Sequence, residues 1–176
     1  ASRPASAGLI RLFGDKPEDD VRYAASFNSK RMNVKTPECK VRLSEIVLML
    51  SEAYYHKGDN ASALKWLNEL RRNRIKNVSD LTMATLPEVR DGERIIVDCQ
   101  GKAVTPLLQA IFDERRKELY MEGDRWYELK RNGCPEWWVI SNGLKYTTKE
   151  YLYTSPISKS DVDLNPSLEQ NPGYVY

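Results

Sequence analysis

Hydrophobic residues recur at helical spacing over residues 40–75, and the pattern is interrupted once, at Gly58. The repeating apolar positions are Leu43, Ile46, Val47, Leu50, Ala53 and Tyr54 before the glycine, and Ala63, Trp66, Leu67 and Leu70 after it. Spacing of this kind places apolar side chains on one face of a helix. Glycine favours a helix end, and Asp59 or Asn60 can cap the next helix. The pattern therefore predicts helices over 40–57 and 61–75, packed antiparallel as an αα-hairpin.

A third predicted helix begins at Thr105, which can cap a helix that carries Pro106 in its first turn. One face of this helix carries Leu108, Ile111, Phe112, Arg115 and Leu119. Gly123 is expected to end the helix, and Asp124 can cap a shorter helix that follows.

Two other segments give weaker patterns. Asp91-Gly92 lies between short β-prone runs, which predicts a small β-hairpin near 88–98. The segment that carries Trp137 and Trp138 is predicted to be a loop because it follows a glycine, Gly133.

The C-terminal tail holds three prolines, at Pro156, Pro166 and Pro172. Proline interrupts helices and sheets, so the tail is predicted to be extended and rich in turns, without a helix. Its apolar residues are expected to pin it to the rest of the chain; they are Leu164, Leu168 and Tyr174. Together the patterns predict a mostly α-helical fold with long loops, in a single domain over residues 1–176.

Composition narrows the possible functions. Hydrophobic residues make up 41% and charged residues 30% of the chain, values typical of a soluble globular domain. A net charge of +2 gives no reason to expect nucleic acid. Cys39, Cys99 and Cys134 are odd in number and form no C-x-x-C pair, and the chain has one histidine. We therefore expect no zinc site, no disulfide framework and no cofactor.

The stretch ERRKELYMEGDRWYELKR, residues 114–131, combines eleven charges with two adjacent aromatic residues. Its acidic residues Glu114, Glu118 and Glu122 follow one helix line, where like charges repel. Nearby cations are therefore required, and the basic residues able to supply them across Gly123 are Arg115, Arg116, Arg125 and Lys130. Arg115 is expected to be partly buried with a bidentate carboxylate partner. The predicted ion-pair joint between two helices consists of Glu114, Arg115, Glu118, Glu122, Arg125 and Trp126.

A catalytic or metal site built from the same acids is the alternative interpretation. Di-iron bundles pair glutamate with a Glu-x-x-His motif, but Met121 stands where the histidine would be. The single histidine, His56, ends another predicted helix, whose terminus it can complement. Because no nucleophile motif or phosphate-binding loop is present either, the residues predict a protein that is not an enzyme.

Three motifs resemble the SusD/RagB family. The stretch 114–131 is similar to the family signature E-R-R-x-E-L-x-x-E-G-x-R-W-x-D-L-x-R, with Glu128 at a position where aspartate is usual. The end of the chain, SPISKSDVDLNPSLEQNPGY, resembles the family's closing motif, with Ser158 in place of a proline. Residues 41–73 are similar to the family's helix-pair repeat, with Ser51 in place of alanine. The resemblance runs from about residue 8 to the end of the chain.

The resemblance implies a fold of tetratricopeptide-like helix pairs and a role in polysaccharide utilisation. SusD-like proteins are lipid-anchored on the extracellular face of the cell outer membrane, bind an oligosaccharide or a peptide, and deliver it to a TonB-dependent outer-membrane transporter without cleaving it. Residues 1–176 resemble the C-terminal part of such a protein, so the lipid anchor is expected outside this chain. Alternatives are a peptide-binding member of the same family, or a helical-repeat adaptor that binds another protein.

Aromatic residues in predicted loops are the candidates for ligand contact, because sugar rings stack on flat aromatic faces. Trp137 and Trp138 are the first candidates, and Tyr146, Tyr151 and Tyr153 are further ones. The alternative for the two tryptophans is that one packs against the core and the other against the tail.

Overall fold

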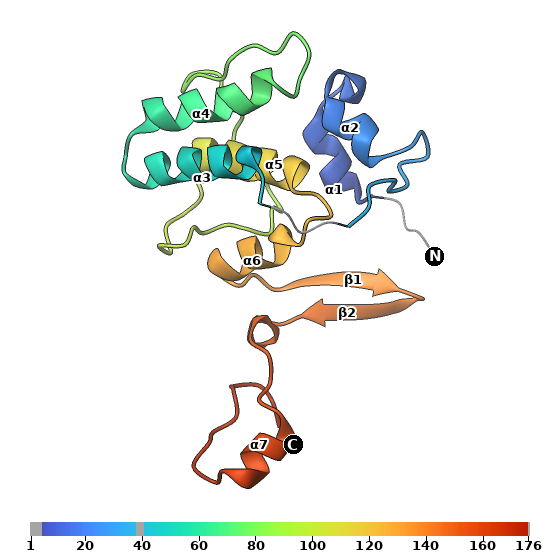
Figure 1. Cartoon of the computed structure of the whole chain (residues 1–176), viewed down its shortest axis with the longest axis vertical. Coiled ribbons are helices and arrows are strands. Elements are labelled where there is room, and N and C mark those ends of the chain that lie inside the picture. Colours follow the sequence, from blue (N-terminus) through green and yellow to red (C-terminus); the bar gives the residue numbers. More distant parts are fainter. Residues whose placement is uncertain (1–4, 38–40, 176) are drawn as a thin grey trace. The chain divides into compact units, whose positions relative to one another are not determined.

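Helices dominate the computed structural model, which describes residues 5–37 and 41–175, and the predicted mostly α-helical fold class is confirmed (Figure 1). The helices are Ala7–Ile10 (α1), Val21–Ser26 (α2), Leu43–His56 (α3), Asn60–Arg72 (α4), Pro106–Glu118 (α5), Asp124–Arg131 (α6) and Lys159–Leu164 (α7). Short 3₁₀ helices are Arg11–Phe13 (η1), Pro17–Asp19 (η2) and Glu150–Tyr153 (η3). The strands are Trp137–Ser141 (β1) and Leu144–Thr148 (β2).

The chain forms two compact units that alternate along the sequence. The first comprises Ala1–Asp91 and Val104–Tyr127, and the second comprises Gly92–Ala103 and Glu128–Tyr176. Helices α1 to α5 therefore belong to the first unit, and the two strands belong to the second. That residues 1–176 fold as one domain stays a prediction.

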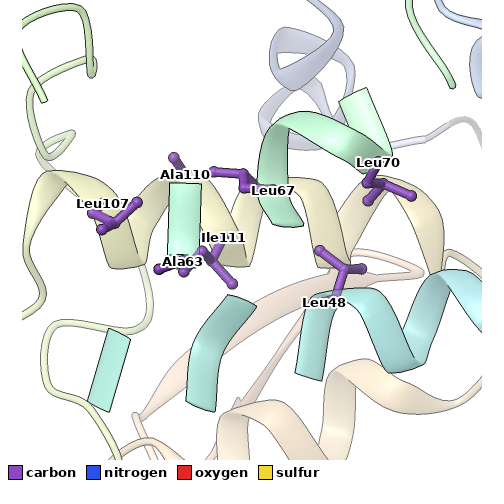
Figure 2. Close-up of a cluster of buried hydrophobic side chains, with 7 residues drawn as sticks. All are labelled: Leu48, Ala63, Leu67, Leu70, Leu107, Ala110 and Ile111. Atoms are coloured by element: carbon purple, nitrogen blue, oxygen red, sulfur yellow. The ribbon is translucent and has the colours of Figure 1, made fainter. Parts of the chain in front are cut away.

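The predicted αα-hairpin is confirmed in the first unit, where α3 and α4 pack on each other and on α5. Gly58 adopts a φ of +81°, which ends α3, and the Asp59 side chain caps α4 by accepting from the Ser62 amide at 3.0 Å. Leucine, isoleucine and alanine side chains of the three helices form one buried cluster (Figure 2). Its members are Leu48, Ala63, Leu67, Leu70, Leu107, Ala110 and Ile111.

The buried face of α3 differs from the predicted one. Leu43 and Ile46 are 76% and 44% exposed, whereas Val47 and Tyr54 of the same predicted stripe pack against the buried cluster. The buried residues of α3 are Ser44, Leu48, Ser51 and Glu52. Ser51 is small enough to lie beneath α4, where its hydroxyl donates to the Ala63 carbonyl at 2.8 Å. The close packing of α3 against α4 therefore determines which face of α3 is buried, and hydrophobicity alone did not predict that face.

Helix α5 is buried on most of its circumference. Thr105 caps it as predicted, with its hydroxyl oxygen accepting from the Leu108 amide, and Pro106 occupies the first turn. Every residue from Leu107 to Phe112 is buried, so α5 is enclosed well beyond the single predicted stripe. Its charged C-terminal half, which begins at Asp113, is consequently placed largely out of water as well.

The only regular strands in the described residues form a hairpin at 137–148, and the prediction of a hairpin near 88–98 is wrong. Strands β1 and β2 pair antiparallel from Trp137↔Thr148 to Ser141↔Leu144. Their connection is Asn142-Gly143, with φ of +53° and +77°, the left-handed values that a two-residue hairpin turn requires. Trp137 and Trp138 therefore lie on a strand, and the prediction that they lie in a loop is also wrong.

Residues 88–98 instead lead into a compact loop. Val97 forms a single bridge with Ala103, and the Asp98 carboxylate between them accepts from the Gln100 and Lys102 amides at 2.8 Å each. The side-chain oxygen of Asp98 thus replaces the backbone partners that a hairpin would have supplied.

The tail is mostly coil, as predicted, but it also contains α7, which the prolines did not predict. Ser158 caps α7 by accepting from the Asp161 amide at 3.2 Å, which explains how a helix starts between two prolines. Leu164 is 84% exposed, so the expectation that it pins the tail is wrong. Tyr174 does make contacts: its ring meets the Tyr151 ring edge-on at 5.1 Å, and its hydroxyl donates to the Thr154 carbonyl.

Candidate functional site

Glu118, near the end of α5, is surrounded by three arginines from distant parts of the first unit. Arg74 Nε donates to Glu118 Oε2 at 3.0 Å, and Arg42 Nη1 donates to Oε1 at 2.9 Å. Arg22 Nη1 lies 3.4 Å from Oε2. The Glu118 side chain is 2% exposed, so these arginines compensate a charge that water cannot reach.

Glu114 and Glu122, one helical turn to either side, are paired in the same way. Glu114 lies 2.8 Å from Arg22 Nη2 and 2.9 Å from Lys117 Nζ. Glu122 accepts from Lys35 and from Arg42, whose Nη2 lies 2.8 Å from Oε1. These groups, together with Asp20 beside Arg22, form one connected ion-pair cluster. Its members are Asp20, Arg22, Lys35, Arg42, Arg71, Arg74, Glu114, Lys117, Glu118 and Glu122.

The cluster supplies partners of the three glutamates that sequence spacing did not predict. Sequence spacing nominated Arg115, Arg116, Arg125 and Lys130, whereas the cluster brings Lys117 and basic residues between 22 and 74 to the glutamates. A cation next to a glutamate in a helix points to another side of that helix, whereas a distant segment can approach the glutamate face directly. Only the tertiary fold brings that segment near.

Arg115 joins α5 to α6, as the predicted ion-pair joint requires. Its side chain is 5% exposed, and Nη2 lies 2.6 Å from Asp124 Oδ1, across Gly123. Gly123 has a φ of +81°, which allows the sharp turn between the helices. Arg125 is half-buried, and Trp126 is 38% exposed.

The cluster keeps Glu114 and Glu118 ionised. Burial alone would raise the pKa of Glu118, but the hydrogen bond and charge of Arg74 and the charge of Arg22 outweigh it and lower the pKa to about 2. Burial likewise opposes ionisation of Glu114, and the charges of Lys117 and Arg22 still lower its pKa. A general acid needs a raised pKa, so neither glutamate is suited to proton donation near neutral pH.

No group of three or more histidine, cysteine, aspartate or glutamate side chains suited to a metal ion occurs in residues 5–37 and 41–175. Cys134 is a free thiol and Cys99 is exposed, while Cys39 lies outside the described residues. Each helix in the described part of the chain is too short or too polar to span a lipid bilayer.

A pocket of about 540 Å³ lies in the second unit and brings the two predicted ligand-contact tryptophans together. The residues that border it come from 92–97 and from 132–138: Gly92, Glu93, Arg94, Ile96, Val97, Asn132, Gly133, Pro135, Glu136, Trp137 and Trp138. Its size is that of a typical small-molecule site, and its border mixes aromatic faces with carboxylate, amide and guanidinium groups. We refer to it below as the tryptophan pocket.

Trp137 is held rigidly at the border of this pocket. Its indole N–H donates to the Tyr153 hydroxyl at 3.1 Å, and that hydroxyl donates to the Pro135 carbonyl at 2.9 Å. The Arg94 guanidinium lies 4.2 Å from the centre of the Trp137 ring, within cation–π distance. Tyr153 is 3% exposed, so it orients Trp137 and offers no surface for ligand contact.

Trp138 is the open member of the pair, because 54% of its surface is exposed. It pairs across the hairpin with Thr147, and Lys145 Nζ lies 5.2 Å from its ring centre. Of the further candidates, Tyr146 is 52% exposed on β2, whereas Tyr151 packs against Tyr174. Trp138 therefore has the largest accessible aromatic face at the tryptophan pocket.

Sequence patterns did not predict the 92–97 side of the pocket. The one local signal in the sequence is the glycine at position 133. In the structure Gly133 has a φ of +83°, and a Cβ there would lie 2.5 Å from Val97 Cγ2. A glycine is therefore required where the two segments meet, but its sequence neighbourhood does not say which segment it meets.

Comparisons with known proteins support the motif resemblance. The sequence model of the SusD family matches residues 20–174. Over 139 residues the chain is 28% identical to the starch-binding protein SusD of Bacteroides thetaiotaomicron, an alignment that covers 76% of this chain and 21% of that protein. The chain thus spans about one fifth of the length of that curated relative.

Solved structures show the same fold. A SusD superfamily protein from Bacteroides vulgatus matches with a TM-score of 0.61 and 25% identity, over 95% of this chain and 38% of that one. A SusD-like protein from Bacteroides fragilis matches with a TM-score of 0.50 and 23% identity, over 76% of this chain and 25% of that one.

Proposed function

The chain belongs to the SusD family, and from this premise we propose that the complete protein binds a glycan at the bacterial cell surface and delivers it to a TonB-dependent transporter. The complete protein is lipid-anchored on the extracellular face of the outer membrane in this proposal. The relative that is named a starch-binding protein supports the glycan as ligand. Transport then depends on release of the glycan in unchanged form.

The observation that carries the glycan proposal for this chain is the tryptophan pocket. Sugar rings have an apolar face that stacks on indole, and their hydroxyls require polar partners at the rim. Trp138 offers the exposed face, while Trp137 is fixed in orientation by Tyr153 and Arg94. Glu93 and Glu136 border the same pocket and can accept hydrogen bonds from hydroxyl groups.

The paired state of the glutamates supports binding without cleavage. Hydrolysis of a glycoside requires two carboxyl groups with different protonation, one of them raised in pKa. Glu114 and Glu118 are both lowered in pKa by their basic partners. At the tryptophan pocket, Glu136 is paired with a cation, since its Oε2 lies 2.8 Å from Lys149 Nζ.

Calorimetric titration of the complete protein with malto-oligosaccharides tests the proposal. We expect weak binding that Trp138→Ala weakens ten-fold or more. Trp126→Ala removes a partly exposed tryptophan that does not border the pocket and is the matched control, with unchanged affinity expected. Since stacking needs no charge, raising the salt concentration should change the affinity little.

Three results would contradict this proposal. Equal loss of affinity in the two variants would remove the pocket as the binding site. Shortened oligosaccharides after incubation with the protein would contradict the non-enzymatic role. Binding of a peptide library in place of every glycan tested would favour the peptide-binding alternative.

Delivery to a transporter is tested separately. Affinity purification of the complete protein from detergent-solubilised outer membranes should retain a β-barrel transporter. If the protein is recovered without any such partner after mild cross-linking, the delivery step is contradicted while glycan binding stands.

A further inference from the structure

A second pocket, of about 270 Å³, lies in the first unit at the ion-pair cluster. Its charged lining consists of five basic side chains and one acidic one: Arg22, Lys35, Arg42, Arg74, Lys117 and Glu118. We call it the basic pocket. It is distinct from the tryptophan pocket, with which it shares no lining residue.

Charges in and around the basic pocket are arranged in layers. The carboxylates are deeply buried, with side-chain exposures of 2% for Glu118 and 6% for Glu122. Three of their basic partners remain accessible, with exposures of 32% for Arg42, 26% for Arg74 and 23% for Lys35, whereas Arg22 is 7% exposed. An ion approaching from solvent therefore meets the positive charges first.

The cluster also carries more positive than negative charge. Within the described residues, six basic side chains share four carboxylates, an excess of two positive charges. In a concave, partly desolvated setting such an excess attracts an anion more strongly than the same charges would on an open surface.

The basic side chains at this pocket carry more N–H groups than the hydrogen bonds they donate. Lys35 Nζ donates to Glu122 Oε1 among the described residues, although an ammonium carries three N–H groups. Within the described part of the chain, Arg74 Nη1 and Nη2 each donate once, to Asn73 O and Glu118 Oε1, although each carries two N–H groups. The basic pocket thus has donors to offer to a ligand.

We propose that the basic pocket binds one tetrahedral oxyanion group, a sulfate or a phosphate, either as a free ion or as an ester on a small sugar. Guanidinium and ammonium groups are the usual partners of such oxygens. The pocket is too small for an extended polyanion, and its described lining contains no aromatic side chain on which a nucleobase could stack. This proposal does not depend on glycan binding at the tryptophan pocket.

A charge placed at the rim of the pocket tests the proposal without breaking an ion pair. Ala25 lines the pocket on α2 and is exposed, and its neighbour Ala24 is exposed but outside the lining. We expect titration calorimetry with sodium sulfate, at constant ionic strength maintained with chloride, to detect binding. Ala25→Glu should weaken that binding at least ten-fold, while Ala24→Glu, which adds the same charge, should leave it unchanged.

A second pair of variants keeps the test decisive if Ala25→Glu fails to fold. Lys35→Gln removes a donor at the pocket, whereas Lys30→Gln removes an exposed lysine outside its lining. The Glu122 carboxylate keeps Arg42 as a partner in the first variant. Lower sulfate affinity in Lys35→Gln alone supports the site. Absence of sulfate binding in the unaltered protein, or equal affinity in the two lysine variants, would overturn it.

The source of the oxyanion is resolved by comparing probes. Galactose 6-sulfate that binds more tightly than inorganic sulfate, with no binding of galactose, indicates a sulfated sugar. Equal affinity for the two sulfates indicates a free ion. Malto-oligosaccharide binding should be the same in Ala25→Glu as in the unaltered protein, so failure at one pocket is distinguishable from failure at the other.

Discussion

Glu118 is the residue at which folding and ionisation are most tightly linked in this chain. Three arginines from residues 22–74 contact its carboxylate, which is nearly inaccessible to water. Removing one partner of such a buried pair costs much more than removing a surface pair, because the remaining charge stays buried. Substitution of Glu118 or of one of its three arginine partners should therefore lower the stability of the fold.

The pH dependence of folding should reveal Glu118. Its folded pKa of about 2 lies below the ordinary value of 4.5, so its ionised form stabilises the fold above about pH 4.5, and this contribution is lost as the pH falls toward 2. We expect Glu118→Gln to lower the free energy of unfolding at pH 7 by roughly 3 kcal/mol and to flatten its decrease between pH 4.5 and 2. Urea titrations across this range measure both effects.

Glu69→Gln is the control for that measurement, because Glu69 and its partner Arg72 are both exposed. It should change neither the stability nor its pH dependence appreciably. An acid sensitivity that is the same in Glu118→Gln and in the unaltered protein would contradict the assignment.

Arg115 is expected to hold the turn between α5 and α6. Arg115→Ala leaves the Asp124 carboxylate without its 2.6 Å partner, and we expect a loss of about 3 kcal/mol in the free energy of unfolding. Combining it with Asp124→Asn should recover part of the loss, as a double-mutant cycle in urea would measure. Arg125→Ala should cost less, because Arg125 is only half-buried. Strictly additive losses in the cycle would show that the pair is not coupled.

At the scale of elements, the two hairpins of this chain have different origins. The helical hairpin follows from periodicity, a glycine and an Asp59 cap, all of them local. The β-hairpin follows from the turn dipeptide Asn142-Gly143 between apolar runs, which is also a local signal. Asp91-Gly92 is a turn dipeptide of the same kind, but no hairpin forms around it. Asp98 accepts the nearby backbone N–H groups and stabilises a loop there. A turn dipeptide alone therefore did not identify the strands.

The tail should depend on Gly173 more than on any of its prolines. Gly173 has a φ of +87°, and a Cβ there would lie 2.4 Å from Tyr151 Cγ. Gly173→Ala should therefore separate the tail from Tyr151 and expose it to limited proteolysis after residue 155. Gly143→Ala is the control: its φ of +77° is also positive, but no atom lies within 4 Å of the added Cβ. It should cost only about 1 kcal/mol of backbone strain. Equal protease resistance of both variants would contradict the role of Gly173.

At the scale of the whole molecule, the chain passes between its two compact units three times, after residues 91, 103 and 127. Segment 92–103 is thus tied at both ends to the first unit. We expect one cooperative unfolding transition, in keeping with the prediction of a single domain. Arg115→Ala in the first unit and Gly173→Ala in the second should shift the same calorimetric peak. Two peaks, each shifted by only one of the variants, would show that the units unfold independently.

The sequence by itself determined the helices α3, α4 and α5, the caps at Asp59 and Thr105, and the SusD family motifs. These features depend on residues within a few positions of one another, so periodicity and capping chemistry are sufficient to predict them. Local sequence patterns also identified Trp137 and Trp138 as ligand candidates, although they predicted a loop where both residues lie on a strand.

The tertiary structure alone decided which cations meet the glutamates and what completes each pocket. Arg22 reaches Glu118 across 96 positions and Arg42 across 76, and Arg94 meets Trp137 from another segment of the second unit. The sequence around an arginine does not show which carboxylate or indole its side chain will contact, since any of several arginines is chemically suitable. The path of the chain selects among them, and that path is set by burial of the α3, α4 and α5 cluster, to which these polar residues do not contribute.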